Sequence, residues 1–509
     1  MRLIWLAAAL GAMTVGATVG GAAVREPAVA GGFYPADPER LRAMVDGLLD
    51  KAPRPASPPA AVIAPHAGSV FSGAVAAEAF AGWRGVKARR VIVLGPSHHV
   101  GFSGAALPAS GVTAFATPLG NLPLDGAAIE RLRKMPGFDG PPDAHGPEHS
   151  IEVELPFLQR TVGNVPIVPI LVGPRTDPQT VRGLARALAP LLGEGTLVVA
   201  SSDFTHHGAA YGWTPFPREG LGERLLALGR ATAGRAAAID PLGFREQVEV
   251  SGDTVCGRHP IGVLLELLAH AFDGTGRLLD VTTSGHVSGN WSQCVTYAAV
   301  AFDGAWRRWR DDPAPPELGT LSAGERRALL RLARATLETH TAHGPELANW
   351  FAHHRVEGNL AAIAGAFVTL NHRGRPAAEA LRACMGSIVG VRPLAEQVIE
   401  SAVMAAHDPR FPELEAAELP KLVVEISVLS PLKRVPGPEA IRLGTHGVVL
   451  RKDGHGAVYL PQVATETGWD LETFLSHLSV KAGLPPDAWR HGARFEVFTA
   501  QVFSEEGTE

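Results

Sequence analysis

Cysteine is scarce in this chain of 509 residues, and its three cysteines stand far apart. Cys256, Cys294 and Cys384 form no C-x-x-C pair, which argues against a disulfide framework and against a zinc-ribbon site. Charge is also low, since 19% of the residues are charged and the formal net charge is −5. No Lys/Arg-rich run with interleaved aromatic residues occurs, so we do not expect nucleic acid as a partner.

The length and composition indicate a globular protein of more than one domain. A chain of 509 residues is too long for one ordinary core and predicts two or three domains. At the start, residues 1–24 carry Arg2, an apolar segment and small residues at Gly21 and Ala23, a pattern typical of a signal peptide. It predicts export to the periplasm, or an uncleaved membrane anchor; a start codon assigned too far upstream would instead leave the protein cytoplasmic.

The first domain, residues 25–305, alternates short β-branched runs with longer helical patterns. This alternation predicts an α/β fold with a parallel or mixed sheet flanked by helices. The expected strands are 60–64, 90–94, 165–172 and 196–201. The segment 306–321 is charged and then rich in proline, which is typical of a linker between domains.

The second domain, residues 322–509, is smaller and its pattern predicts an α+β fold. Ser322 and Glu325 have the spacing of a capping box, which predicts a helix that follows directly. Further strands are expected at 365–371, 421–429, 446–452, 456–460 and 494–503. Asp453 and Gly454 predict a hairpin turn, and a helix is expected from Asp470 to Ala482.

Three expected strands of the first domain are each followed by histidine. These histidines are His66, the pair His98 and His99, and the pair His206 and His207. In open α/β sheets ligands bind outside the carboxyl ends of the strands, so residues placed there converge although they are distant in sequence. We therefore expect the histidines to face one another.

Two further segments supply side chains that can bind a metal or transfer protons. The first contains Glu148 and His149, and the second contains Cys256 and His259. Imidazole suits iron, copper or zinc, and a thiolate adds a soft anionic ligand. The pattern therefore predicts metal-assisted or acid–base chemistry, but spacing alone does not select the ligands from the eight histidines between His66 and His259.

Two other histidines lie outside this set. His270 falls in an apolar helical run and is interpreted as structural. His286, close to Ser288 and Asn290, is left without a role.

The same segments carry a resemblance to a known family. The stretches AVAGGFYP (28–35), APHAG (64–68), LGPSHH (94–99), EHSIE (148–152), SSDFTHHG (201–208) and CGRHPIG (256–262) resemble the motifs of the Memo family in order. That family is similar in fold to the class III extradiol dioxygenases, whose iron is held by two histidines and a carboxylate. The resemblance implies that His66, His98 and Cys256 are metal ligands, with the cysteine in the place of the carboxylate, and that His206 is an acid–base residue.

The second domain resembles the AMMECR family. The likeness rests on GAFVTLNHRGR (365–375), LRACMGS (381–387), EISVLSPLKRV (425–435) and the stretch from 444 to 470. Within it Cys384 is either a packed structural cysteine in a tight turn or a reactive thiol, if Arg382 lowers its pKa. Thr369, Asn371 and His446 are its candidate neighbours. The chain thus resembles a fusion of components B and A of the AmmeMemoRadiSam system, which implies a radical S-adenosylmethionine protein as partner.

Three functions are compatible with these observations. The first is an oxidoreductase with iron, or less readily copper or zinc, in which His206 transfers protons and Asp203 or Glu148 orients it or contacts an unknown small-molecule substrate. The second is a module that binds a redox metal and a protein partner without turnover. The third is metal-assisted hydrolysis.

Overall fold

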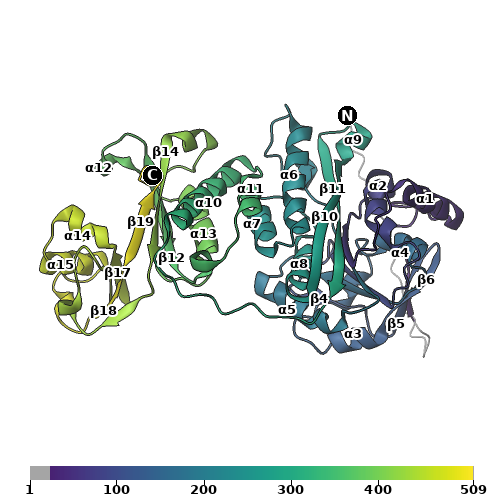
Figure 1. Cartoon of the computed structure of the whole chain (residues 1–509), viewed down its shortest axis with the longest axis horizontal. Helices are drawn as coiled ribbons and strands as arrows, with labels where there is room; N and C mark the ends of the chain where they lie inside the picture. Colours follow the sequence, from purple (N-terminus) through teal and green to yellow (C-terminus); the bar gives the residue numbers. More distant parts are fainter. Residues whose placement is uncertain (1–22, 508–509) are drawn as a thin grey trace, which may run out of the picture.

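The computed structural model describes residues 23–507, so the predicted signal segment lies almost entirely outside the described residues. The described chain forms two lobes that lie side by side along the longest axis (Figure 1). Within residues 23–507 no helix combines the length and the apolar character needed to cross a lipid bilayer.

The first lobe is built on a mixed sheet of eight strands, as the sequence pattern predicted. Its main path runs β10-β11-β2-β8-β3-β7-β4, and β9 pairs with β11. The four central strands β2, β8, β3 and β7 are parallel, whereas β11 joins β2 and β4 joins β7 in antiparallel fashion. The strands of this sheet are β2 (Ala61–Ala64), β3 (Arg90–Pro96), β4 (Ala105–Ala106), β7 (Ile167–Val172), β8 (Thr196–Ser201), β9 (His206–Gly208), β10 (Phe272–Thr283) and β11 (Gln293–Trp306). A separate small sheet contains β1 (Ala23–Arg25), β5 (Val112–Thr117) and β6 (Gly120–Pro123).

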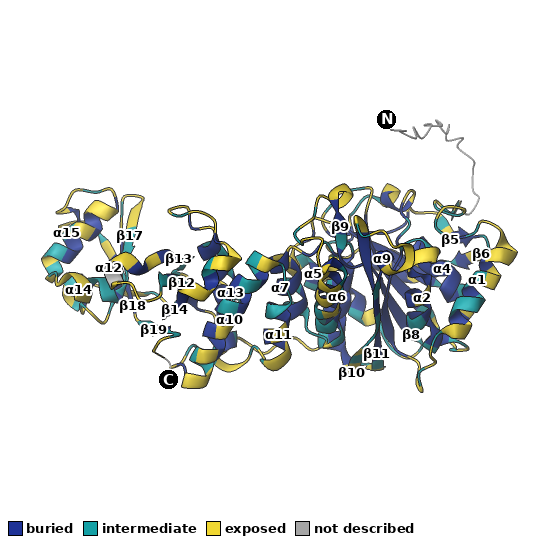
Figure 2. Ribbon diagram, turned by 90° about the horizontal axis from the view of Figure 1, so that it is seen from above, coloured by how far each residue is buried: buried dark blue, intermediate teal, exposed yellow. Residues whose placement is uncertain are grey.

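Helices cover both faces of the large sheet. Alternate side chains of each central strand point to opposite faces, so each face has an apolar core that the helices bury. Ile63 and Ile92 pack into one core and their neighbours Val62 and Val91 into the other. The helices of this lobe are α1 (Pro38–Lys51), α2 (Ser69–Phe80), α3 (Gly126–Leu132), α4 (Leu155–Thr161), α5 (Pro178–Leu188), α6 (Leu221–Ala237), α7 (Pro241–Ser251), α8 (Arg258–Ala271) and α9 (Ser284–Ser288). Figure 2 shows the buried strands between these helices, whose exposed residues face outward.

The second lobe contains two sheets of four strands, in the orders β13-β12-β14-β19 and β15-β18-β16-β17. Its strands are β12 (Gly365–His372), β13 (Leu381–Ser387), β14 (Leu422–Leu429), β15 (Lys433–Val435), β16 (Gly447–Lys452), β17 (His455–Tyr459), β18 (Arg494–Phe498) and β19 (Ala500–Ser504). Its helices are α10 (Ala323–Ala342), α11 (Glu346–His353), α12 (Ala377–Ala380), α13 (Leu394–Ala406), α14 (Pro461–Thr467) and α15 (Leu471–Lys481).

Several local predictions for this lobe are confirmed. Ser322 and Glu325 form both hydrogen bonds of a capping box at the start of α10, and Asp470 caps α15. Asp453 and Gly454 form the tight turn between β16 and β17, with φ values of 49° and 81°. Both residues therefore adopt the left-handed conformation that two-residue hairpin turns require.

One strand prediction is wrong. The expected strand 494–503 is two strands, β18 and β19, which belong to different sheets. They separate at Thr499, whose backbone N–H donates to the Ser430 hydroxyl and whose carbonyl accepts from the Ser430 N–H. Because Thr499 turns both of its backbone groups to Ser430, the chain passes from one sheet to the next at this residue.

Candidate metal centre

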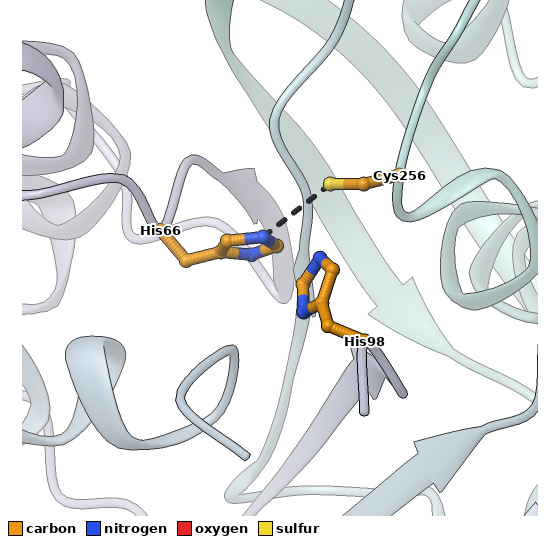
Figure 3. Close-up of side chains that lie close together, drawn as sticks. All are labelled: His66, His98 and Cys256. Atoms are coloured by element: carbon orange, nitrogen blue, oxygen red, sulfur yellow. Dashed lines mark hydrogen bonds between the residues drawn. The ribbon is translucent and has the colours of Figure 1, made fainter. Parts of the chain in front are cut away.

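The three strands that end in histidine are direct neighbours in the sheet. Since the order is β2-β8-β3, the segments that follow Ala64, Ser201 and Pro96 emerge at the same edge. There His66 and His98 meet Cys256, which arrives from the loop between α7 and α8 (Figure 3). The possible donor atoms of these three residues all lie within 4.8 Å of one another, and His66 Nε2 is 3.3 Å from Cys256 Sγ.

The approach of the cysteine depends on the glycine beside it. A Cβ atom at Gly257 would lie 2.4 Å from the side chain of Ser202, which follows β8. The Gly257 N–H also donates to the Ser202 hydroxyl at 3.0 Å. The loop can therefore pack closely enough on β8 to deliver Cys256 only because residue 257 has no side chain.

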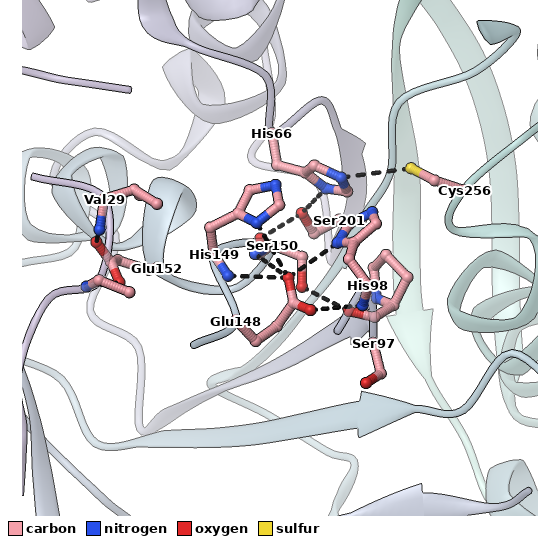
Figure 4. A network of polar contacts seen from close by, with 12 residues as sticks. Val29, His66, Ser97, His98, Glu148, His149, Ser150, Glu152, Ser201 and Cys256 are labelled. Atoms are coloured by element: carbon pink, nitrogen blue, oxygen red, sulfur yellow. Dashed lines mark hydrogen bonds and ion pairs between the residues drawn. The ribbon is translucent and has the colours of Figure 1, made fainter. Parts of the chain in front are cut away.

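His66 is held by a buried polar chain whose other members, Ser201 and Glu154, were not among the predicted site residues. Its Nδ1 lies 2.7 Å from the Ser201 hydroxyl, which in turn lies 2.8 Å from Glu154 Oε1 and 2.6 Å from the Ser150 carbonyl (Figure 4). Burial raises the pKa of Glu154 well above its usual range. The Ser201 hydroxyl shares its single proton between the oxygens of Glu154 and Ser150, both of which accept from it. The Nδ1–H of His66 then donates to Ser201, and its Nε2 lone pair faces Cys256.

His98 is held by Glu148. The carboxylate of Glu148 accepts from the His98 N–H at 2.6 Å and from its Nδ1 at 2.9 Å, and also from the backbone N–H groups of His149 and Ser150 (Figure 4). Burial alone would raise the pKa of Glu148, but these hydrogen bonds, led by that of His98, hold it well below its usual range. A carboxylate behind the imidazole fixes the tautomer that leaves Nε2 free to bind a metal.

His206 and Asp203 also reach this edge of the sheet, but they do not bond to each other as expected. The Nδ1 of His206 lies 2.8 Å from the Phe204 carbonyl and 3.1 Å from the Thr254 carbonyl, so backbone groups orient the ring. Asp203 Oδ1 instead accepts from the His66 N–H at 2.9 Å. Asp203 and Glu148 therefore orient His66 and His98 rather than His206, because the loop geometry places each carboxylate beside one of these two histidines.

Burial disfavours the protonated form of two imidazoles at the site. It lowers the pKa of His66 well below its usual value and also lowers the pKa of His206. Burial likewise raises the pKa of the Cys256 thiol, and a bound cation would favour its deprotonation. Burial would lower the pKa of His98, but its hydrogen bonds to Cys256 and Glu148 raise that pKa to about 10, so a metal would have to displace a proton from this ring. Two imidazoles and one thiol around a common point fit a transition metal such as iron, copper or zinc.

The structure places His149 in the site, although the sequence motifs assigned it no role of its own. Its ring stacks on that of His98 with 4.8 Å between centroids and lies edge-on to that of His66 at 5.6 Å. Its Nδ1 is 3.4 Å from Glu148 Oε1. His149 therefore forms a wall of the site, a role that its position beside Glu148 in the sequence could have suggested.

The other histidines lie apart from this convergence. His207 is buried beside Trp213, His145 bonds to the Ala106 carbonyl, and His286 bonds to Thr283 at the start of α9. His259 lies in the first turn of α8. His270, interpreted as structural, stacks on Trp309 and bonds to the Arg310 carbonyl, next to the linker.

Two family models match the chain, one in each lobe. The model of the Memo-like protein family matches residues 25–301, and that of AMMECR1 matches residues 330–503. The chain belongs to the Memo-like family and carries an AMMECR1 domain behind it.

Relatives of each half occur as separate proteins. The MEMO1 family protein MK0963 of Methanopyrus kandleri is 36% identical over 293 residues, which are 55% of this chain and 98% of that protein. Protein MEMO1 of Xenopus tropicalis is 34% identical over 55% of this chain and 97% of its own length. Protein PF1979 of Pyrococcus furiosus is 39% identical over 185 residues, which are 35% of this chain and 87% of that protein. The crystal structure of the uncharacterized protein PH0010 of Pyrococcus horikoshii aligns with a TM-score of 0.31 at 37% identity and covers 35% of this chain and 91% of its own.

In the AMMECR1 domain Cys384 lies in the edge strand β13 rather than in a tight turn. Of its three expected neighbours Thr369 is in contact, with its hydroxyl 3.2 Å from Cys384 Sγ. Asn371 pairs with Leu381, and His446 Nδ1 accepts from the Arg442 N–H. Arg382 turns to Glu418 and the Pro412 carbonyl, and the backbone of Cys384 is held instead by Asp408 and Arg410.

Proposed function

We propose that the Memo-like domain is a metal-dependent oxidoreductase that uses a non-haem iron. The observation that carries this proposal is the convergence of His66, His98 and Cys256 at one edge of the sheet, with their donor atoms within 4.8 Å of one another. Three protein ligands leave coordination positions open for small molecules, as in other two-histidine sites that use oxygen. The resemblance to class III extradiol dioxygenases supports the same function.

The residues around the three ligands have separate tasks in this proposal. Bound iron would supply one-electron chemistry and a Lewis acid at the open positions. The Nδ1–H of His206 is held by two carbonyls, so its Nε2 is the atom that takes a proton from a substrate hydroxyl or returns one. Asp203 fixes the backbone of His66, and Glu148 fixes the ring of His98.

A second function is favoured by the sulfur ligand. Cys256 Sγ is a soft donor, and a thiolate beside a redox metal is open to oxidation where a carboxylate is not. The same three side chains therefore suit a module that sequesters a redox metal without turnover. Bound metal is common to both functions, and only turnover separates them.

The first experiment is metal analysis of protein purified without oxygen. We expect near-stoichiometric iron in the natural chain and its loss in His66→Ala and in Cys256→Ser, because each change removes one donor. The matched controls are His99→Ala, the neighbour of a ligand, and Cys384→Ser, the cysteine of the other domain; both should keep the metal. A correctly folded natural chain that binds no metal under these conditions refutes the proposal.

The role of His206 is tested on the metal-loaded protein. A screen of catechol-like substrates in air should show turnover that His206→Ala loses while it keeps both the fold and the iron. Equal turnover in the two proteins removes His206 from the reaction. Iron binding without turnover on any substrate of this class favours the sequestering module.

A further inference from the structure

One helix of the Memo-like domain belongs to the hydrophobic cores of both domains. Phe244 and Val248 of α7 lie in the core of the first domain, whereas Val250 of the same helix lies in the core of the AMMECR1 domain. Both views place α7 at the junction of the two lobes, next to α10 and α11 (Figures 1 and 2). The domains are therefore packed together through α7, which contributes buried residues to the core of each.

A buried glutamine joins the domains at the middle of α7. The side chain of Gln247 is completely buried; its Nε2 donates to the Gly344 carbonyl at 2.9 Å, and its Oε1 accepts from the Ala348 N–H at 2.8 Å. Both backbone groups belong to the AMMECR1 domain. Separation of the domains would expose all of these polar groups and would break both bonds at once.

A histidine of the second domain holds the end of the same helix. His343 follows α10 and has a left-handed backbone with φ of 56°, a conformation that non-glycine residues rarely adopt. Its Nδ1 lies 2.7 Å from the carbonyl of Ser251, the last residue of α7, and its ring lies edge-on to Trp213. A disfavoured backbone of this kind persists where the surrounding contacts fix it, and here the contacts cross the domain boundary.

The segment that begins at Ser251 leads directly to the metal centre. Thr254 accepts from the His206 N–H at 2.7 Å and donates to the His206 carbonyl at 2.9 Å. Cys256 follows two residues later. The loop 252–257 thus carries one proposed ligand and holds the proposed acid–base residue, and its starting point is held by the other domain.

We infer that α7 is the docking surface for the AMMECR1 domain and that the docked domain positions His206 and Cys256 through the loop 252–257. Gln247 and His343 are positioning residues in this arrangement, since neither lies among the metal ligands. The part of the inference that concerns the metal rests on the proposed function.

The linker allows the docking to be tested in the whole chain. Residues 313–317 are exposed and have neither helix nor strand, so a protease site placed there can be cut after the full protein has folded. We expect the cut halves to elute together in size-exclusion chromatography and to bind iron as the uncut chain does. Halves that separate at micromolar concentration, with unchanged iron affinity, overturn the inference.

Two variants test the positioning. Gln247→Ala removes the two hydrogen bonds that this side chain makes to the second domain and should weaken the association of the cut halves. His343→Gly removes the bond to Ser251 but relieves the left-handed backbone, so we expect unchanged thermal stability together with iron affinity at least tenfold weaker. The matched control is His353→Ala, an exposed histidine of α11 whose Nδ1 bonds within its own helix.

The outcomes separate the two proposals. Iron affinity that stays the same in His343→Gly refutes the positioning role. A natural chain without iron refutes the proposed function instead, while the elution of its cut halves still decides whether the domains dock. Should Gln247→Ala fail to fold, the cut natural chain decides the docking and His343→Gly decides the positioning.

Discussion

Ser201→Ala tests whether the buried polar chain behind His66 supports metal binding. The Ser201 hydroxyl contacts His66 Nδ1, Glu154 Oε1 and the Ser150 carbonyl, and the other oxygen of Glu154 has no partner among the described residues. The substitution therefore leaves a fully buried carboxyl without any hydrogen bond. A buried polar group without a partner costs about 1–3 kcal/mol, which lowers the melting temperature of a domain of this size by roughly 2–12 °C.

The same substitution removes the hydrogen bond that orients the His66 ring. Loss of a group that orients a metal-binding histidine weakens metal affinity by about 10- to 100-fold. The assay is anaerobic competition with a chelator of known affinity, alongside calorimetry of the metal-free protein.

The double variant Ser201→Ala with Glu154→Leu separates the two effects. It removes the orphaned carboxyl at similar volume, so stability should return toward that of the natural protein. Metal binding should stay weak, because nothing holds His66 Nδ1. The reasoning is refuted if the double variant recovers metal affinity together with stability, or if Ser201→Ala binds metal as tightly as the natural protein.

Two further predictions concern packing and pH. Gly257→Ala places a methyl group 2.4 Å from the Ser202 side chain, so it should abolish tight metal binding and lower the free energy of unfolding by about 1–3 kcal/mol. The control Gly234→Ala has open space around its Cβ position and should have neither effect. Equal metal affinity in the two variants contradicts the packing argument. Burial lowers the pKa of His145 from 6.5 to about 4, so below about pH 6.5 the folded chain binds fewer protons than the unfolded chain. The stability that depends on neutral His145 is complete above that pH and is lost as the pH falls toward about 4. As the pH falls from about 8 to about 5.5, this histidine lowers the free energy of unfolding by about 1.4 kcal/mol. His145→Gln retains a donor for the Ala106 carbonyl and should reduce the pH dependence of chemical denaturation by that amount; an unchanged pH dependence contradicts the assignment.

Much of the first domain could be predicted from its sequence because its strands are short apolar runs. The expected strands around Ile63, Ile92, Ile170 and Val198 all occur, and histidine follows three strands of the sheet as predicted. Runs of β-branched residues bounded by turn residues are a local signal, and they survive in the fold because both faces of the sheet are buried.

The support of the site could not be predicted in the same way. Ser201 and Glu154 were not among the predicted site residues. Ser201 meets His66 because β8 lies beside β2, and Glu154 reaches Ser201 from the short helix Glu152–Glu154. Asp203 or Glu148 was expected to orient His206 or to contact substrate, yet the turn after β8 directs the Asp203 carboxylate to the backbone of His66. The separation of β18 from β19 at Thr499 could not be predicted either, because residues 494–503 carry one unbroken strand-like pattern.

The sequence by itself determined the local elements and placed His66, His98 and His206 just beyond strand ends, because hydrophobic periodicity and turn residues act over a few neighbours. Only the tertiary structure decided that β2, β8 and β3 lie side by side, that Gly257 lets Cys256 approach them, and that α7 enters the core of the second domain. Strand order and domain packing are set by contacts between residues far apart in the chain, which no short pattern encodes.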